Sequence, residues 1–247
     1  MCWVGSATIP PKPSTTTTLS STTTTPVRRT VAPVVDTIPD PCEAQPDAIA
    51  KIRNEIVVFQ GQYFWRLDKR GYRVDRPMKI SRFWYGLPEN LTHIDAAYTK
   101  PDRDRIVIFI GDQYWEFALN YPTPGYPKLL TDLGLPDTVT HIDVAFIWGY
   151  NGKLYFFSGT QYWRFDERTS KVEPDYPRKA TVWKGVPLPV QAAFTDHEDN
   201  TFFISGDNAY RFHGWFMRVY DGWPKKLSQL WSSCSSNKNR IVTNPRL

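Results

Sequence analysis

The sequence predicts an all-β fold, a four-bladed β-propeller, from three observations. First, one hairpin pattern of aromatic and β-branched residues around a glycine turn occurs four times, at residues 58–68, 108–118, 156–166 and 203–213. Second, successive turn glycines lie 50, 48 and 47 residues apart, and a fixed period of this length is typical of repeat architectures. Third, a cysteine stands at each end of the repeated region, at Cys42 and Cys234. The turn glycines are Gly61, Gly111, Gly159 and Gly206.

Each unit begins with a short segment that we expect to be the innermost strand of a blade. The four segments start at Asp47, His93, His141 and Val190. Small residues recur in them, which suggests strands that crowd together around an axis. The small residues are Ala48, Ala96, Ala145 and Ala193.

Each unit closes with an aromatic, proline and basic element, at residues 76–88, 126–136, 176–187 and 223–231. Proline fixes φ and suits the entry into a short helical turn. Trp84, Trp183 and Trp231 recur at similar offsets and are predicted to plug the core, with Leu133 in that role in the second unit. Together with the hairpin, these segments supply the four strands that a propeller blade needs. Four further aromatic residues are predicted to pack blade against blade: Tyr63, Tyr114, Tyr162 and Tyr210.

Composition divides the chain into three parts. Residues 1–41 are predicted to be a disordered Thr/Pro-rich hinge, because residues 14–25 are Ser or Thr at eleven of twelve positions and offer nothing apolar to bury. This hinge is either an O-glycosylated stalk or an unmodified spacer. Residues 42–234 are predicted to form the propeller, and residues 235–247 a flexible basic tail. The expected blades cover about 42–91, 92–139, 140–190 and 191–234.

The cysteines and a sequon indicate an extracellular, secreted protein. A bridge between Cys42 and Cys234 would tie the ends of the array together, and it would persist only in an oxidising compartment. Cys2 is left over. Asn90 begins an N-glycosylation sequon, a permissive signal. No signal peptide and no run of 18 apolar residues occurs, so we expect the C-terminal part of a longer protein without a membrane span of its own.

The net charge of +5 does not by itself identify a partner. Basic residues gather after Asp221, where the tail is either a solvated segment or a contact for heparin-like polyanions. Nucleic acid is not expected as a partner, because no motif that reads it is present.

At this point the residues resemble the hemopexin-like domain at the C-terminus of the matrix metalloproteinases. The resemblance covers residues 42–234 and rests on the four hairpins, the aromatic-proline elements and the terminal cysteines. The fourth unit departs from the pattern at Gln191, where the others carry Asp, and at Ala209, where they carry an aromatic residue. The resemblance implies that residues 1–41 are the hinge to a protease domain.

The resemblance also implies a non-catalytic exosite. Its partners would be extracellular-matrix proteins such as collagen, tissue inhibitors of metalloproteinases, and in a homodimer a second copy of the chain. No catalytic residue is predicted, because the string at His197, "HEDN", lacks the second histidine of a zinc-binding H-E-x-x-H motif. Zinc would belong to the absent catalytic domain. Two alternatives stay open: a fragment of a complete zinc- and calcium-dependent metalloendopeptidase, and an adhesive matrix protein of the vitronectin type.

The resemblance further implies a cation, commonly calcium, in the central channel. Backbone carbonyls would hold it, and such oxygens suit Ca²⁺. In the alternative interpretation the Asp side chains only satisfy exposed N–H groups. His93 and His141 are read as repeated packing, and haem is not expected, because the linker carries no histidine. The predicted carbonyl ligands belong to Asp47, Asp95, Asp143 and Gln191.

Overall fold

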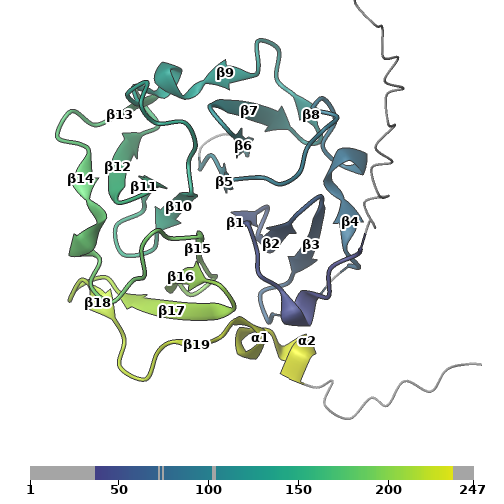
Figure 1. Ribbon diagram of the computed structural model, residues 1–247, viewed down its shortest axis with the longest axis vertical. Coiled ribbons are helices and arrows are strands. Elements are labelled where there is room, and N and C mark those ends of the chain that lie inside the picture. The colour runs from purple at the N-terminus through teal and green to yellow at the C-terminus, as the bar shows by residue number, and fades with distance from the viewer. Residues whose placement is uncertain (1–36, 72, 74, 102–103, 236–247) are drawn as a thin grey trace, which may run out of the picture. The chain divides into compact units, whose positions relative to one another are not determined.

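Four antiparallel sheets stand in a ring in the computed structural model, which describes residues 37–71, 73, 75–101 and 104–235. In each sheet the strands follow one another in chain order, and the first strand of each sheet lies nearest the centre of the ring (Figure 1). The prediction of an all-β, four-bladed propeller is therefore confirmed. The predicted hinge up to residue 36 and the tail from residue 236 lie outside the described residues.

The blades are built alike, and in the last three the outer strand is divided into two short pieces that both pair with the third strand. Blade 1 contains β1 (Ala48–Ile52), β2 (Glu55–Gln60), β3 (Tyr63–Leu67) and β4 (Met78–Lys79). Blade 2 contains β5 (Ala96–Thr99), β6 (Ile106–Ile110), β7 (Gln113–Ala118), β8 (Tyr121–Pro122) and β9 (Lys128–Leu129). Blade 3 contains β10 (Val144–Trp148), β11 (Lys153–Ser158), β12 (Gln161–Asp166), β13 (Lys171–Val172) and β14 (Arg178–Lys179). Blade 4 contains β15 (Ala192–Thr195), β16 (Thr201–Ser205), β17 (Asn208–His213), β18 (Arg218–Val219) and β19 (Lys225–Lys226).

A short helical turn follows the last strand of every blade, as the proline-containing elements predict. These turns are η2 (Ile80–Arg82), η3 (Leu130–Leu133), η4 (Ala180–Val182) and α1 (Leu227–Leu230). The first residue of each donates its main-chain N–H to a carbonyl in the turn of the blade's own central hairpin, at 2.8 to 2.9 Å. Two further turns lie at the ends of the described chain, η1 (Pro41–Glu43) and α2 (Ser232–Ser235).

The strand register corrects two alignments expected from the sequence. Ala48 and Ala96 are in phase with Val144, not with Ala145, because each pairs with the hairpin residue that aligns with Phe157. Ala145 and Ala193 do line the space at the centre of the ring, but Ala48 and Ala96 lie one position earlier in their strands and pack between blades instead. The period of two along a strand explains the error, since a shift of one residue moves a side chain to the other face.

The four tyrosines are likewise not equivalent. Tyr114 and Tyr162 pair with Phe109 and Phe157, and both are buried between blades. The residue in that register is Phe64 in blade 1 and Ala209 in blade 4. Tyr63 lies one position before it, and the half-buried Tyr210 one position after. Tyr114 and Tyr162 therefore pack blade against blade at one repeated position, as predicted. Tyr63 and Tyr210 occupy other positions of their hairpins.

The core is divided among the four junctions between neighbouring blades. Each junction holds a cluster of buried apolar side chains from the two facing sheets. The predicted plugs are all buried, with 2 to 4% of their surface exposed. They are Trp84, Leu133, Trp183 and Trp231.

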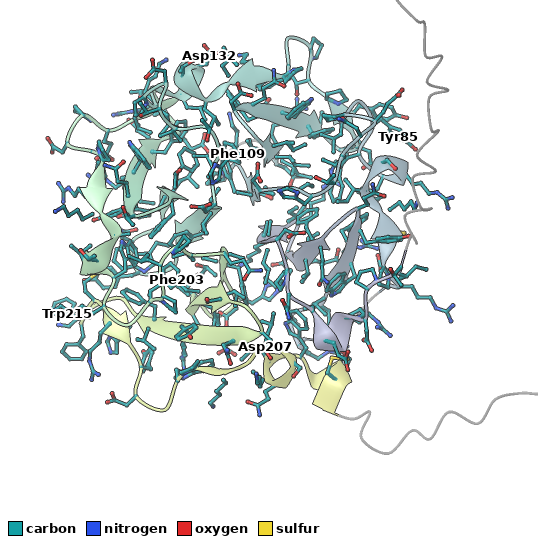
Figure 2. All side chains as sticks on the ribbon, viewed as in Figure 1. Tyr85, Phe109, Asp132, Phe203, Asp207 and Trp215 are labelled. Atoms are coloured by element: carbon teal, nitrogen blue, oxygen red, sulfur yellow. A yellow bond between two sulfur atoms is a disulfide. The ribbon has the colours of Figure 1, made fainter. Side chains whose placement is uncertain are left out.

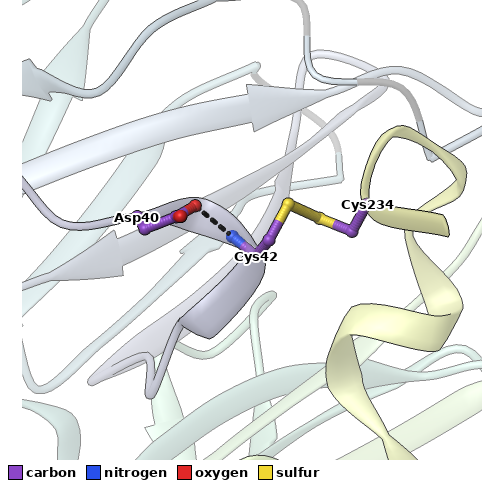
Figure 3. Close-up of a disulfide and its surroundings, with 3 residues drawn as sticks. All are labelled: Asp40, Cys42 and Cys234. Atoms are coloured by element: carbon purple, nitrogen blue, oxygen red, sulfur yellow. Dashed lines mark hydrogen bonds between the residues drawn. A yellow bond between two sulfur atoms is a disulfide. The ribbon is translucent and has the colours of Figure 1, made fainter. Parts of the chain in front are cut away.

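A disulfide joins the two ends of the ring, as predicted (Figure 3). Cys42 lies in η1 and Cys234 in α2, 192 residues later, with their Cα atoms 5.4 Å apart. The Asp40 carboxylate accepts a hydrogen bond from the Cys42 main-chain N–H at 2.9 Å and caps the turn that carries the cysteine. The first and last blades are thus linked covalently beside their interface.

Candidate functional site

The four residues that precede the inner strands make the same hydrogen bond. Each side chain accepts a bond from the main-chain N–H of the turn glycine in its own blade. The bonds are Asp47 Oδ2 to Gly61 N, Asp95 Oδ2 to Gly111 N and Asp143 Oδ2 to Gly159 N, each 2.6 Å, and Gln191 Oε1 to Gly206 N at 2.8 Å. These glycines have φ between 56° and 60°, a left-handed conformation that suits glycine at a tight turn. The side chains therefore fasten each hairpin turn to the start of the inner strand.

Main-chain carbonyls of two inner strands face the neighbouring blade. Thr99 Oγ1 donates to the Lys51 carbonyl at 3.1 Å. Thr195 Oγ1 donates to the Ile147 carbonyl at 2.6 Å. These carbonyls thus point away from their own hairpins, toward the next blade. The four residues that precede the inner strands donate their own main-chain N–H to a carbonyl of the second strand of the blade, at 2.9 to 3.2 Å. They are Asp47, Asp95, Asp143 and Gln191.

Negative charge gathers at this end of the channel. Burial raises the pKa of the Asp47 carboxyl above its usual value, while the Gly61 N–H and His93 lower it and the nearby Asp95 carboxylate raises it. A cation placed near these two carboxylates would offset the repulsion between them. Hard main-chain carbonyl oxygens, together with this charge, would fit the ligand preference of Ca²⁺.

Gln191 has a second bond that the sequence did not suggest. Its Nε2 donates to the carbonyl of Pro46 at 2.8 Å, while its Oε1 accepts from Gly206. An aspartate could accept the bond from Gly206 but could not donate to Pro46, because a carboxylate is an acceptor alone. The amide thus ties blade 4 to the residue before blade 1. The signal available in the sequence was that this departure falls in the last unit, the one that must meet the first.

The two equivalent histidines take part in the same turn network. His93 Nε2 lies 3.0 Å from Asp95 Oδ1, and His141 Nε2 lies 3.0 Å from Asp143 Oδ1. Each ring also meets the preceding threonine hydroxyl through Nδ1. Both nitrogens of each ring are therefore occupied within the blade itself, which agrees with repeated packing.

Side chains alone form no metal centre in the part of the chain that the structure describes. No group of three or more His, Cys, Asp or Glu residues gathers there in a way that could hold an ion. His197, from the "HEDN" string, meets Asn54 of blade 1 through Nδ1 at 3.1 Å. Across the same described ranges, no helix combines the length and apolar character needed to cross a lipid bilayer.

Asn90 lies on the surface between blades 1 and 2. Asn90 and Thr92 of the sequon are both exposed, while Leu91 between them is buried in the junction. The asparagine is therefore sterically open, and its loop is held in place by the leucine.

A cavity of about 530 Å³ opens at the opposite end of the channel. Its wall consists mainly of the inner strands, with Ala97, Ala145 and Ala193 near the axis. Two lysines at its rim are engaged within the molecule: Lys51 Nζ donates to the Asp196 carbonyl at 3.2 Å, and Lys100 Nζ lies 3.0 Å from Glu116. Sequence reasoning did not identify this cavity, because its shape depends on how far apart the four strands stand.

Comparisons with known proteins agree with this architecture. A family model described as Hemopexin matches residues 46–89, 94–137 and 142–187, which together make up more than half of the chain. These ranges fall in the first three blades. The fourth blade is the one whose sequence departs from the repeat at Gln191 and Ala209.

Several curated proteins are similar to this chain in sequence. Matrix metalloproteinase-2 of Drosophila melanogaster is 41% identical over 203 residues, which cover 82% of this chain and 27% of that protein. Matrix metalloproteinase-17 of Homo sapiens is 42% identical over 163 residues, covering 66% of this chain and 27% of that protein. Stromelysin-3 of Xenopus laevis is 33% identical over 203 residues, covering 82% and 42%. The chain thus spans less than half the length of these relatives.

Solved structures share the fold at lower identity. A plant lectin with two metal binding sites from Cicer arietinum has a TM-score of 0.65 at 18% identity, covering 80% of this chain and all of that one. The hemopexin fold protein CP4 from cow pea has a TM-score of 0.65 at 17% identity, covering 79% and 99%. At these identities the likeness concerns the fold alone.

Proposed function

The chain belongs to the hemopexin family, as a hemopexin-like domain of a matrix metalloproteinase. From that premise we propose that it is a non-catalytic exosite that holds extracellular-matrix proteins such as collagen, and tissue inhibitors of metalloproteinases, close to a tethered protease. A tethered binding module acts by raising the local concentration of its partner, with the linker setting the reach. The proposed site of action is extracellular.

One observation carries this proposal: the repeated polar side chains are hydrogen-bonded within the blades. The aspartates bind the glycine N–H groups, and the histidines bind the aspartates. These are the chemistry-bearing groups that the repeat brings to one end of the ring. Their engagement supports a rigid scaffold that presents its loops and edges to partners.

The protease activity is assigned to the rest of the parent protein. The sequence contains no H-E-x-x-H motif, which zinc hydrolysis on a helix requires. The relatives are two to four times as long as the matched region, which favours a parent zinc metalloendopeptidase as the second interpretation. Finding that motif upstream in the transcript would establish it.

Calcium is proposed as the channel cation. The carbonyls of Asp47, Asp95, Asp143 and Gln191 would supply four of the six to eight oxygens that Ca²⁺ takes, with water completing the shell. The Gln191→Asp variant tests this, because it adds a fourth carboxylate to the ring. Calcium should raise the melting temperature of the wild type, and raise it more in this variant. The exposed Asp137→Asn serves as a control for bulk charge, and an equal response to calcium and magnesium would contradict the assignment.

We also propose that Asn90 carries an N-linked glycan and that the chain forms a homodimer. Expression in secretory cells with and without Asn90→Gln should show a mass difference of one glycan on an SDS gel. Sedimentation equilibrium of the full chain should give twice the monomer mass of 28.6 kDa. A monomer at every concentration would contradict the homodimer.

The experiment that tests the exosite is capture of matrix proteins by the purified full chain, in calcium and in chelator, with mass-spectrometric identification. Capture of a collagen or a tissue inhibitor is expected, and weaker capture in chelator would link the cation to binding. Capture of neither from extracellular-matrix extract, by a chain shown to be folded by near-UV circular dichroism, would overturn the proposal.

A further inference from the structure

The junction between blades 3 and 4 is filled by two indole rings. Trp183, at the end of η4, lies with its ring centroid 4.7 Å from that of Trp148 on β10. It also lies 5.6 Å from the ring of Tyr162 and 5.1 Å from that of Phe212. Trp183 thus reaches from its own blade onto the next one.

The junction between blades 2 and 3 has the same framework without either indole. Leu130 and Ala180 begin the equivalent helical turns, so the third residue after each places Leu133 where blade 3 has Trp183. The inner-strand register places Lys100 where blade 3 has Trp148. The walls are retained, since Tyr114 stands for Tyr162 and Phe165 for Phe212.

The missing rings leave a cavity of about 370 Å³ at this junction. Leu133 is buried at its wall, so the sequence was right that this residue enters the core, but the leucine does not fill the space of an indole. The volume lies within the range of small-ligand sites, about 300 to 1,000 Å³. The lining comprises Tyr98, Lys100, Tyr114, Tyr126, Lys128, Asp132, Leu133, Phe165, Ser170 and Lys171. Asp132 marks the place, near the outer edge of blade 2 (Figure 2).

The polar groups in the wall are already paired. Lys100 Nζ lies 3.0 Å from Glu116 and 3.8 Å from Glu167, and the Tyr126 hydroxyl donates to Glu116 at 3.2 Å. Burial raises the pKa of Tyr114 to about 12, so its hydroxyl stays neutral. The wall therefore presents aromatic faces and neutral hydroxyls.

The mouth of the cavity carries positive charge. Lys128 Nζ lies 4.8 Å from the centroid of the Tyr126 ring, and Lys171 Nζ donates to the Asp132 carbonyl at 2.8 Å. Neither lysine has a carboxylate partner among the ion pairs of the described residues. Both ammonium groups can thus meet an incoming anion. The exposed Asp132 carboxylate opposes its entry, whereas the Glu116 and Glu167 carboxylates lie beside Lys100.

We propose that this cavity, defined as the junction 2–3 pocket, takes an aromatic side chain that stands beside an acidic residue in an extended segment of a partner protein. The argument for the occupant is internal, because the same framework one junction further on encloses an indole. The lysines at the mouth select the neighbouring carboxylate. This inference rests on the proposed binding role and specifies the chemistry of one contact.

The first test measures small probes on the full chain by ligand-detected NMR. The probes are N-acetyl-tryptophan, which carries a carboxylate, its uncharged amide, and N-acetyl-alanine. We expect saturable binding of N-acetyl-tryptophan, several-fold weaker binding of the amide, and none of N-acetyl-alanine. Failure of N-acetyl-tryptophan to bind saturably would overturn the pocket.

A filling variant ties that binding to the site. Leu133→Trp gives blade 2 the indole of blade 3 and should weaken N-acetyl-tryptophan binding at least tenfold. The control is Leu129→Trp, which adds an indole on the exposed β9 of the same blade and should leave binding unchanged. Undiminished binding to a folded Leu133→Trp chain would overturn the assignment.

Rim variants keep the test decisive if the filling variant does not fold. Lys128→Gln combined with Lys171→Gln should abolish the preference for the acid over the amide, because both side chains are exposed and only their charge is removed. The matched control is Lys179→Gln on the exposed β14 of blade 3. A preference that survives the double substitution would contradict the role of these lysines.

Displayed peptides test the protein source. Peptides selected on the full chain should carry Trp, Phe or Tyr next to Asp or Glu and should lose binding to Leu133→Trp, while selection of peptides without an aromatic residue would overturn the proposal. The outcome is separable from that of the exosite. Capture of a matrix protein without probe binding would refute the pocket alone, and probe binding without any capture would refute the matrix partners alone.

Discussion

The two junctions of blade 4 hold it to its neighbours by different means. Toward blade 3, aromatic rings cross the interface: Phe146 and Trp183 both contact Phe203, at centroid distances of 5.4 Å. Loops also meet closely there, since a Cβ on Gly149 would come within 2.1 Å of the Asp199 carbonyl oxygen. Hydrogen bonds add to this packing: Thr195 Oγ1 donates to the Ile147 carbonyl at 2.6 Å, and the Val219 N–H to the Lys184 carbonyl at 2.9 Å.

Toward blade 1, the junction is reinforced by a disulfide. Among the ring pairs of the described residues, none joins blade 4 to blade 1, and Ala209 occupies the register that an aromatic residue fills elsewhere. In compensation, the junction carries the disulfide, the bond from Gln191 to the Pro46 carbonyl, and the bond from Lys51 Nζ to the Asp196 carbonyl.

The difference shows how one repeat can serve two tasks. A junction inside the array brings together segments that are close in sequence, whereas the closing junction brings together segments 192 residues apart. Closing a longer loop has a larger entropy cost. Cross-links at that junction oppose fraying where the chain ends would otherwise separate.

The largest expected effect comes from removing the covalent link. The Cys42→Ser, Cys234→Ser double variant should lose about 5 kcal/mol in the free energy of unfolding, from the chain-entropy estimate for so long a loop. Denaturant unfolding followed by tryptophan fluorescence measures this. A loss below about 1 kcal/mol would mean that the polar bonds alone close the ring.

Next in size is the loss of the Trp183 indole at the junction between blades 3 and 4. Trp183→Ala should lower the free energy of unfolding by about 3 to 5 kcal/mol, because it removes a buried ring and leaves a cavity. The control is Trp215→Ala, whose side chain is 72% exposed at the edge of blade 4 (Figure 2) and should change stability by less than about 0.5 kcal/mol. Equal losses in the two variants would contradict the packing account.

A smaller effect should follow from making the closing junction resemble the others. Ala209→Phe gives blade 4 the phenyl ring that Phe64 supplies at the equivalent position of blade 1. Ala209 has no exposed surface and packs in the same cluster as Leu227 and Trp231. Overpacking should reduce stability by about 1 to 3 kcal/mol. A stabilised variant, measured by thermal unfolding, would show unfilled space at this junction and weaken the contrast.

The smallest effect should be a dependence on pH at the closing junction. Burial lowers the pKa of His197, with Lys51 and Lys69 adding to that direction and Asp196 and Asp68 opposing it. A folded-state pKa below the unfolded value of about 6.5 means that the unfolded chain binds the proton more tightly. Stability should therefore be complete above pH 6.5 and decline as the pH falls toward 5.

His197→Gln isolates this contribution, because it retains a polar side chain near Asn54 and cannot titrate. The wild type should lose more stability than the variant between pH 7 and pH 5, as measured by thermal unfolding. His93→Gln is the control for a histidine outside this junction. Parallel pH profiles for the wild type and His197→Gln would exclude the effect.

The sequence by itself determined the architecture of this protein. The hairpin period, the proline-containing elements and the terminal cysteines specify four alike blades and their closure, because these depend on local chain geometry and on an order that repeats. The end of the channel that holds the aspartates was also identifiable, since Asp47, Asp95 and Asp143 recur at one phase. Residue-level phasing was less secure, as the alanines and tyrosines show, because a strand reverses its side-chain face at every residue.

Only the tertiary structure decided what each junction contains. Leu133 was recognisable as the counterpart of a tryptophan, but the space it leaves depends on Lys100 and Phe165, which come from different blades. In the sequence, Gln191 is a position without the negative charge of the other three units. In the structure, its amide reaches the Pro46 carbonyl, 145 residues away. Such features arise where segments distant in sequence meet, and pairing across those distances is set by the packing of the closed ring rather than by any local pattern.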